Sequence, residues 1–576
     1  MLSPSVFIDS MEKSHHCQQC NTVFVINSQD LVFYQKIDVP LPTLCPRCRL
    51  IRRLIWRNER ALYRRKCSSC GKAIIALYSK DKPWKVYCPP CYYSEAWDPM
   101  AYGREYDFSK PFFAQFKEFM LAMPWPSLAV DWQTLINSAY NNQASNLKNC
   151  YLLSHAGNDE GCLYSSALKF SKDSSDIALG QFCELSYEGV NLFKCYRVFF
   201  SQDCENCNDV WFSKNLFNCS NCFSCANLRN KQYYIFNKPY SKEEYQKKIS
   251  KYNFGSYQDI KKLLIDSSKF FQRFPQKYIH GRHNEKVSGD YIYESKNVFS
   301  SFEIIGAQNC KYCQFLDNKG NFACYDYTDW GANAQFVYES VLCGDGMNRI
   351  KFCYNAFNEC QDVEYSLYPQ FSSSYLFGCI GLKGRKHCIL NIQYTKEEYE
   401  TLRTRIIEHM NKAPYIDGKG RTYRYGEFFP PALSLFAYNE TTAQEYFPLT
   451  KEGAKNIGYF WKNPEKSLYQ TTISASQLPD DIKDADDAVL NEIIQCGNCE
   501  KAYRIIKPEL QLYKRLILPL PRQCPSCRHQ ARILKKGPLE LYSKKCAQCG
   551  APIQTSYSLE SNTIVWCESC YRKDFI

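Results

Sequence analysis

Eight Cys-x-x-Cys pairs are the residues of this chain with the clearest chemistry, which is the binding of metal ions through thiolates. A tetrahedral zinc site takes four ligands, and one such pair supplies two of them from a tight turn. The pairs form two sets of four, and each cysteine of the second set lies 479 positions after its counterpart, as Cys496 does after Cys17. We therefore predict two copies of one double zinc-ribbon module, with four structural zinc ions held by Cys17, Cys20, Cys45, Cys48, Cys67, Cys70, Cys88, Cys91, Cys496, Cys499, Cys524, Cys527, Cys546, Cys549, Cys567 and Cys570.

The spacing within each module favours zinc sites made from consecutive pairs. The last two pairs of the first module enclose a strand, a turn from Ser79 to Pro83 and a second strand, which is typical of a zinc ribbon. An interleaved arrangement, in which Cys17 and Cys20 join Cys67 and Cys70, remains an alternative. Neither arrangement leaves a ligand position open for water, which indicates structural rather than catalytic sites.

A strongly basic stretch separates the two sites of the first module. From Arg47 to Lys66 it holds nine Lys or Arg residues and one acidic residue, Glu59. Its apolar spacing predicts a helix packed on the zinc sites, with the arginines on the outer surface, where a guanidinium suits phosphate. The candidate nucleic-acid contacts are Arg49, Arg52, Arg53, Arg57, Arg60, Arg64 and Arg65, with Arg528, Arg532, Lys535 and Lys536 in the second module. The alternative is a solvated helix face whose charge offsets that of the thiolates.

The net charge belongs to the two ends of the chain. The whole sequence carries +13, while residues 1–100 and residues 490–576 each carry +7, so the middle is close to neutral. The 33 cysteines are an odd number dense in Cys-x-x-Cys pairs, which favours reduced thiols over a disulfide framework. We expect neither a signal peptide nor a membrane-spanning helix, and we expect a cytoplasmic protein.

The middle of the chain contains a second internal repeat. The segment from Cys225 to Tyr245 matches the segment from Cys379 to Tyr399 at an offset of 154, and each copy ends in a capping box that opens a helix. Upstream of each, short strand-like pieces recur at a regular interval, such as that from Cys183 to Cys195, between Asn, Asp, Gly and Ser. Two such pieces per coil predict a parallel β-solenoid of roughly 22–24 residues per coil, in which cysteines stack as small buried side chains. The alternatives for the cysteines are extra zinc sites or an iron–sulfur cluster, because Cys204/Cys207, Cys219/Cys222/Cys225 and Cys310/Cys313 have ligand spacing.

The predicted fold class is mainly β and multidomain, with the two modules flanking a duplicated β-solenoid that carries short capped helices. The expected segments are an N-terminal double zinc-ribbon module over 1–100, a helical or loop connector over 101–149, a first solenoid repeat with a terminal helix over 150–250, a helical connector over 251–285, a second repeat with a terminal helix over 286–410, an aromatic and acidic linker over 411–490, and a C-terminal module over 491–576.

Taken together, four segments resemble a group of large zinc-ribbon proteins encoded in candidate-phyla bacterial genomes, for which no activity is established. They are CPRCRLIRRLIWRNERALYRRKC, WDPMAYGREYDFSKPFF, CANLRNKQYYIFNKPYSKEEY and FAYNETTAQEYFPLT. The resemblance implies a bacterial cytoplasmic setting and cysteines that act as zinc ligands.

The leading functional hypothesis is a zinc-binding, non-enzymatic protein whose basic modules hold nucleic acid, RNA slightly ahead of DNA, across a solenoid spacer. A zinc-stabilised scaffold for protein partners is the alternative. A third possibility is an enzyme in the solenoid groove near His280 and His283, which form the only cluster of histidines and acidic residues in the sequence; a turn between the solenoid halves explains them equally well.

Overall fold

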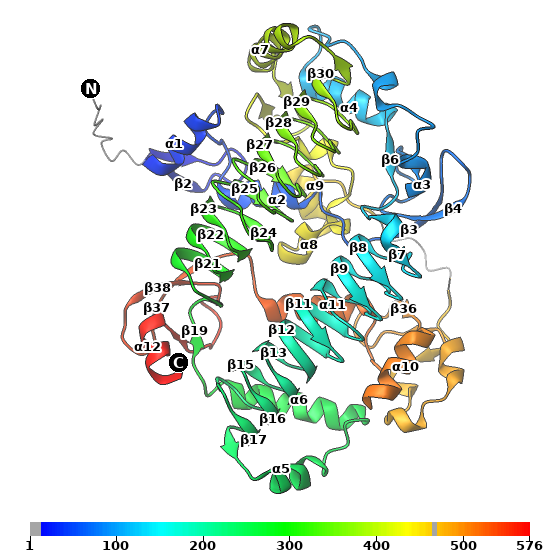
Figure 1. The fold of residues 1–576 in the computed structure, drawn as a ribbon, viewed down its shortest axis with the longest axis vertical. Helices are drawn as coiled ribbons and strands as arrows, with labels where there is room; N and C mark the ends of the chain where they lie inside the picture. The colour runs from blue at the N-terminus through cyan, green and yellow to red at the C-terminus, as the bar shows by residue number, and fades with distance from the viewer. Residues whose placement is uncertain (1–12, 464–468, 576) are drawn as a thin grey trace.

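The computed structural model describes residues 13–463 and 469–575, and within them the protein is mainly β. Two separate solenoids of parallel strands form its centre (Figure 1). Smaller hairpins and short helices at both ends of the chain pack against these solenoids. The predicted fold class is therefore confirmed.

The first solenoid is a 12-stranded sheet that begins at residue 135 and ends at residue 239. Its strands are β7 (Leu135–Ile136), β8 (Asn142–Lys148), β9 (Ser154–Glu160), β10 (Ser166–Lys169), β11 (Ser175–Glu184), β12 (Tyr187–Phe199), β13 (Gln202–Glu205), β14 (Asn208–Trp211), β15 (Lys214–Phe217), β16 (Ser220–Phe223), β17 (Gln232–Ile235) and β18 (Lys238–Pro239).

The second solenoid is also a 12-stranded sheet, from residue 281 to residue 393. Its strands are β20 (Gly281–Arg282), β21 (Glu285–Tyr293), β22 (Lys296–Ile305), β23 (Gln308–Lys311), β24 (Gln314–Leu316), β25 (Tyr325–Thr328), β26 (Tyr338–Val341), β27 (Asn348–Lys351), β28 (Gln361–Glu364), β29 (Ser374–Phe377), β30 (Lys386–Ile389) and β31 (Ile392–Gln393).

One coil of the solenoid is about half as long as the sequence predicted. Ser175 pairs in the parallel register with Tyr187 of the next coil, and Cys183 pairs with Cys195. The interval between successive strand-like pieces is therefore a whole coil, and the prediction that one coil contains two such pieces was wrong.

A short coil is possible because the chain turns a corner at every third position. From Gln143 to Phe236 in the first solenoid, every third residue has a positive φ, as at Asn146, Asn149 and Leu152. A residue other than glycine in this left-handed region costs about 1–2 kcal/mol, and Asn and Asp tolerate the region best. The regular turns close each coil tightly around a narrow interior.

These corners are held by hydrogen bonds between neighbouring coils. At the Tyr164 corner, the backbone N–H donates to the carbonyl oxygen of Tyr151 in the previous coil at 2.9 Å. The corner at Asp176 makes the same kind of bond to the carbonyl oxygen of Leu163 at 3.1 Å. Because such bonds recur from coil to coil, backbone groups inside the stack are satisfied and the strained corners persist.

The cysteines between the modules fill the inside of the solenoids, as predicted. All seventeen are buried. The Cys195 thiol donates to the carbonyl oxygen of Cys204 at 3.3 Å. Burial raises the pKa of Cys183 to about 12, so its thiol stays protonated at neutral pH. Within the described residues, these cysteines form no four-ligand cluster, and the extra zinc sites and the iron–sulfur cluster find no support.

Each solenoid is preceded and followed by a helix. Helix α4 (Phe112–Ala122) and strand β6 (Pro124–Pro126) precede the first, while α6 (Tyr257–Phe271) and β19 (Gln276–Lys277) precede the second. Helices α5 (Lys242–Ile249) and α7 (Lys396–Lys412) follow them. Both predicted capping boxes are present, with Ser241 and Thr395 as the N-cap residues. No helix within the described ranges is long and apolar enough to cross a membrane.

The two terminal modules are each built from hairpins and short helices that carry the cysteine pairs. The N-terminal module has β1 (Lys13–His16), β2 (Val23–Ile26), α1 (Ser28–Lys36), α2 (Pro46–Leu54), β3 (Tyr63–Lys66), β4 (Ala73–Ala76), β5 (Lys85–Tyr87) and α3 (Pro89–Tyr92). The C-terminal module has β35 (Ile494–Gln495), β36 (Ala502–Tyr503), α10 (Lys507–Leu516), α11 (Pro525–Lys536), β37 (Tyr542–Lys545), β38 (Pro552–Thr555), β39 (Val565–Trp566) and α12 (Glu568–Phe575).

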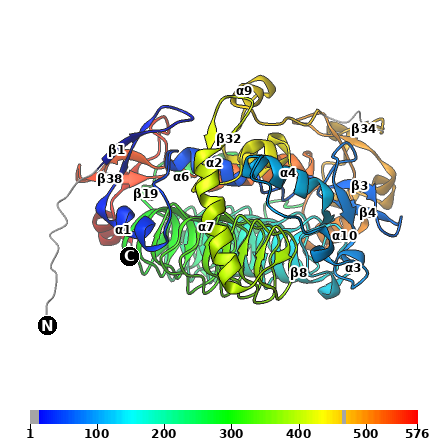
Figure 2. The same cartoon turned by 90° about the horizontal axis from the view of Figure 1, so that it is seen from above.

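Each module contacts both solenoids, in a crossed arrangement. Helix α2 of the N-terminal module packs on β25 and β26 of the second solenoid, whereas α11 of the C-terminal module packs on β11 and β12 of the first. The second half of each module pairs with the strand that leads into the other solenoid, β5 with β6 and β39 with β19. Figure 2 shows the coils as one layer, with helices α2, α4 and α9 (Lys451–Ile457) above it. The two ends of the chain therefore join the two solenoids together.

Candidate functional site

Four groups of four cysteines bring their sulfur atoms together, and each group is made from consecutive Cys-x-x-Cys pairs. Within a group, the ligand atoms all lie within 4.8 Å of one another. The groups are Cys17, Cys20, Cys45 and Cys48; Cys67, Cys70, Cys88 and Cys91; Cys496, Cys499, Cys524 and Cys527; and Cys546, Cys549, Cys567 and Cys570. The expectation of consecutive pairing is confirmed, and the interleaved alternative is wrong. Each group can hold one metal ion.

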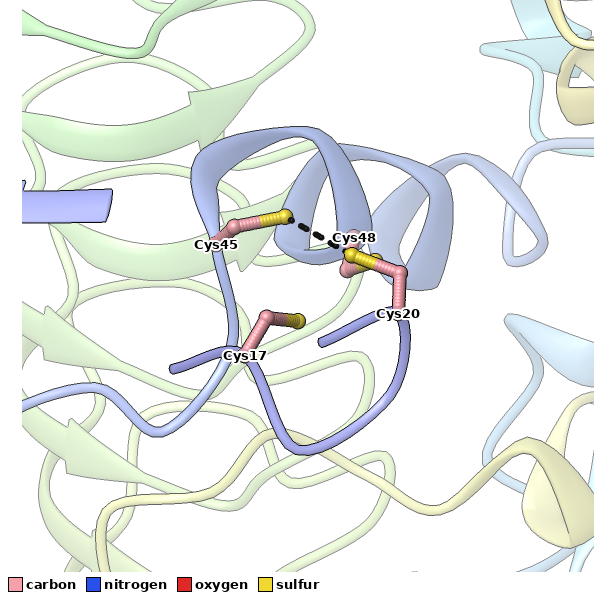
Figure 3. Close-up of side chains that lie close together, drawn as sticks. All are labelled: Cys17, Cys20, Cys45 and Cys48. Atoms are coloured by element: carbon pink, nitrogen blue, oxygen red, sulfur yellow. Dashed lines mark hydrogen bonds between the residues drawn. The ribbon is translucent and has the colours of Figure 1, made fainter. Parts of the chain in front are cut away.

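Figure 3 shows how the first cluster is built. Cys17 and Cys20 come from the loop that joins β1 and β2, whereas Cys45 and Cys48 lie at the start of α2, and all four point toward one centre. Cys45 is the N-cap residue of α2, and Pro46 follows it as the first helical residue. A helix N-terminus carries a partial positive charge, which stabilises thiolates beside it. The same sequence pattern places Cys524 at the N-cap of α11.

Backbone donors prepare these thiols to lose their protons. The backbone N–H of Cys88 donates to the sulfur of Cys67 at 3.2 Å. Burial raises the pKa of Cys67, but backbone donors from Cys70 and Cys88 outweigh that effect and lower the pKa to about 6. The pKa of Cys496 is lowered to about 6 in the same way. Because metal ions bind thiolates rather than thiols, Cys67 and Cys496 each give their cluster one ligand that is ready for a metal near neutral pH.

Three arginines of helix α2, Arg49, Arg52 and Arg53, point into the protein, which corrects the prediction of an outer basic surface. Arg53 is fully buried and forms ion pairs of 2.9 Å with Asp326 and 3.5 Å with Glu339 of the second solenoid. The other buried cations of the first module also have acidic partners; Arg49 pairs with Asp326, Arg52 with Glu339 and Glu427, and Arg57 with Asp329 and Glu59. None of these four side chains is available to a phosphate on the surface.

The C-terminal module repeats this arrangement, with Asp176 of the first solenoid and Glu303 of the second as the acidic partners. Arg528 and Arg532 pair with Asp176 at 3.3 Å and 2.7 Å, and Lys536 pairs with Glu303 at 2.6 Å. All three cations are buried. Arg528, Arg532 and Lys536 are the counterparts of Arg49, Arg53 and Arg57 at the offset of 479. The duplication has therefore kept a row of cations that faces the solenoid.

The remaining candidate contacts are partly or wholly accessible. Arg60 is half-buried, and Arg65 donates to the carbonyl oxygens of Ser79 and Trp84. Arg64 and Lys535 are exposed. Helix α2 ends at Leu54, so Arg64 and Arg65 lie in strand β3 rather than on the predicted helix.

The acidic partners are residues that the sequence analysis missed. Asp176, Glu188, Asp326 and Glu339 all have a positive φ and occupy corners of the solenoid coils. A corner side chain can reach a helix that packs on the outside of the coil. The sequence did contain a signal for these residues, which is an acidic residue that recurs at the corner position of successive coils. That signal can be recognised only when the length of one coil is known.

Both modules and both solenoids meet at one polar interface, where Arg57, His155, Phe315 and Lys536 line a small cavity. His155 of the first solenoid contacts Asp329 of the second at 2.8 Å, and Arg57 contacts the same carboxylate at 3.0 Å. Burial alone lowers the pKa of His155, but the carboxylates of Asp329 and Asp317 outweigh it and raise the pKa to about 9. His155 is therefore a buried cation at neutral pH.

The histidine cluster expected near His280 and His283 does not converge. His280 lies 2.9 Å from Asp290 and 3.2 Å from the Tyr557 hydroxyl group, at the contact between the second solenoid and the C-terminal module. His283 is exposed. The Ser556 hydroxyl also donates to Asp290. These contacts identify His280 as part of the interface between the second solenoid and the C-terminal module.

A large cleft lies where the two modules approach each other. Its volume is about 1310 Å³. One wall comes from strand β4 of the N-terminal module, the other from helix α10 of the C-terminal module, and the floor from the first coils of the first solenoid. Its apolar lining residues include Ile74, Ile75, Leu128, Val130, Leu135, Leu163 and Leu512, and its aromatic ones Trp132, Tyr140 and Tyr151. We call it the inter-module cleft.

Comparison with known proteins finds no matching protein-family model and no similar curated protein.

Proposed function

We propose that this protein is a zinc-stabilised, non-enzymatic binding protein whose ligand is a polypeptide segment of a partner, held in the inter-module cleft. The observation that carries the proposal is the size and lining of the cleft. Small-molecule sites are about 300–1,000 Å³, and this cleft is larger, at about 1310 Å³. Apolar side chains dominate its lining, and an extended peptide with apolar side chains suits such a surface.

Two arginines add a preference for an acidic segment. Arg64 of the N-terminal module and Arg515 of the C-terminal module both line the cleft. Arg515 already contacts Asp173 at 3.2 Å, with half of its side chain exposed. A carboxylate on the partner can therefore be bound by Arg64, Arg515 or both.

Zinc is the metal that best suits the four clusters. Four thiolates arranged around one centre favour zinc or iron, and helix N-termini and backbone N–H donors support the thiolates here. Each Zn(Cys)₄ centre carries a charge of −2, so full loading lowers the formal charge from +13 to about +5. Thiolate ligands also require a reducing compartment, which supports the cytoplasm.

Single-stranded nucleic acid, RNA or DNA, is the second candidate for the same cleft. Trp132 and Tyr140 line it and are partly exposed, and aromatic rings of this kind stack on bases. Arg64 and Arg515 would then contact phosphates. This candidate ranks second because so few of the predicted cations remain accessible.

Photo-crosslinking from inside the cleft distinguishes the two candidates. Gln511 lines the cleft and is exposed, so a photoreactive amino acid can replace it without disturbing the core. This variant should crosslink a polypeptide in cell lysate, and nuclease treatment should leave that product unchanged. The same amino acid at Leu559, which is exposed and outside the cleft, is the matched control and should give no such product.

Two other outcomes of this experiment would change the conclusion. Crosslinks to RNA or DNA that disappear after nuclease treatment would support the second candidate instead. Equal products from both positions would contradict a site in the cleft.

A further inference from the structure

A second groove lies between the two solenoids and meets the inter-module cleft at Val130 and Trp132, which line both. Its volume is about 690 Å³. Gln143, Gly157 and Phe170 line it from the first solenoid, and Trp330 and Phe371 from the second. We call it the inter-solenoid groove.

The second solenoid presents a row of aromatic side chains to this groove. Trp330 lies over Gly344, where a Cβ atom would come within 2.8 Å of the indole ring. Its ring centroid is 5.5 Å from that of Phe357. Phe371 continues the row and is 52% exposed. Gly344 therefore leaves the space in which the Trp330 ring lies against the coil.

The first solenoid faces this row with the ring of Phe170. Phe170 lines the groove and is 50% exposed. It stacks on Phe182 of the next coil at 5.0 Å between ring centroids, with an angle of 11° between the ring planes. Phe182 is not among the lining residues, so the aromatic surface of the groove comes from Phe170 on one side and from Trp330, Phe357 and Phe371 on the other. A ligand made of repeating units matches such a surface.

Amide side chains between the rings have unused hydrogen-bonding groups. Asn355 is 1% exposed, and its Nδ2 atom, near the Tyr368 hydroxyl group, has no partner at hydrogen-bond distance within the described residues. The Oε1 atom of Gln143 is also buried and without a partner there. Both residues line the groove. Buried polar groups are nearly always hydrogen-bonded, so an unpartnered donor and an unpartnered acceptor indicate a ligand or water with hydroxyl groups.

The charged groups of the groove are largely neutralised by one another. Lys169 contacts Asp317 at 2.7 Å, and His155 contacts the same carboxylate at 3.2 Å. Lys383 lies 5.0 Å from the centre of the Tyr93 ring. A nucleic-acid site needs several cations free to contact phosphates. The balance of charges here favours an uncharged ligand.

We propose that the inter-solenoid groove binds a linear, uncharged oligosaccharide. The apolar faces of the sugar rings pack on Trp330, Phe371 and Phe170, and the sugar hydroxyl groups bond to Asn355 and Gln143. Binding is non-covalent, and the site adjoins the inter-module cleft, because Val130 and Trp132 line both.

Calorimetry on the full-length, metal-loaded chain tests this proposal. The probes are hexasaccharides of glucose in two linkages, N-acetylglucosamine, xylose, mannose and galactose, and a single-stranded RNA dodecamer. We expect at least one hexasaccharide to bind, and Trp330→Ala to weaken that binding by ~10-fold or more, because it removes the largest flat face of the groove. Phe371→Ala, at an exposed position where folding is not at risk, should also weaken it.

Phe460→Ala is the matched control, because Phe460 is 49% exposed and lies outside the groove. It should leave the affinity unchanged. The proposal is overturned if no hexasaccharide binds, or if binding is unaffected by both Trp330→Ala and Phe371→Ala. Binding of the RNA dodecamer with the same dependence on Trp330 and Phe371, in place of the sugars, would also overturn it.

Discussion

Arg53, in the helix that follows the first cysteine cluster, pairs with Asp326 at a corner of the second solenoid, with 2.9 Å between nitrogen and oxygen. Both side chains are fully buried. Arg532 and Asp176 form the same contact in the other half of the molecule, at 2.7 Å. The cysteine clusters thus fix the helices whose cations neutralise buried acids of the solenoids, and the metal sites and the solenoids depend on each other.

Removal of one partner from this contact should be costly. Asp326→Asn leaves Arg49 and Arg53 buried with less compensating charge, and the loss of a buried partner costs about 3–5 kcal/mol. We expect a clear fall in the denaturant concentration at the midpoint of unfolding, measured by tryptophan fluorescence. Glu160→Gln, which removes the exposed pair with Lys148, should change stability by about 1 kcal/mol or less. Equal effects of the two variants would contradict the role of the buried pair.

Metal content should separate the ligand cysteines from those of the core. Elemental analysis of the purified protein should find four zinc ions per chain, one for each cluster. Cys48→Ser removes a ligand from the first cluster and should lower the content toward three. Cys313→Ser, in the buried interior of the second solenoid, should leave it at four. A fall in zinc content in the second variant would show that the solenoid cysteines bind metal.

The protonated state of His155 predicts a loss of stability at alkaline pH. Its pKa is about 9 in the folded protein against an ordinary value of 6.5. The stability from its contacts is therefore fully present below pH 6.5 and is lost as the pH rises through about 9. The thermal midpoint should fall over this range, and His155→Gln should make the dependence shallower. His283→Gln, at an exposed histidine, should leave the dependence as it is in the unmodified protein.

The size of the cysteine side chain should matter inside the solenoid. Cys195 is 2% exposed and donates to the carbonyl oxygen of Cys204. Cys195→Ser keeps a small donor at this position, whereas Cys195→Leu overfills the coil and should cost about 1–3 kcal/mol. Thermal unfolding compares the two variants. A leucine variant as stable as the serine variant would mean that the coil interior can expand.

The sequence predicted the features that depend on local spacing. A Cys-x-x-Cys turn brings its own two sulfurs together, so the ligands could be predicted without a fold. The spacing favoured grouping the Cys17 pair with the Cys45 pair, but it left the interleaved arrangement open. Ser241 and Thr395 were recognised as helix caps for the same reason, because a capping box joins an N-cap residue to the third residue of its own helix. The recurrence of Cys183 and Cys195 also predicted a stack of buried cysteines.

Only the tertiary structure decided what surrounds those elements. The coil length requires knowledge of which strands pair, and the interval from Cys183 to Cys195 is compatible with either a whole coil or half of one. The inward direction of Arg53 depends on Asp326, which lies far away in the chain. An arginine-rich helix has the same sequence whether its partner is a phosphate or a buried carboxylate. The crossed contact between each module and the distant solenoid supplied the carboxylates, and it turned the basic stretch into part of the core.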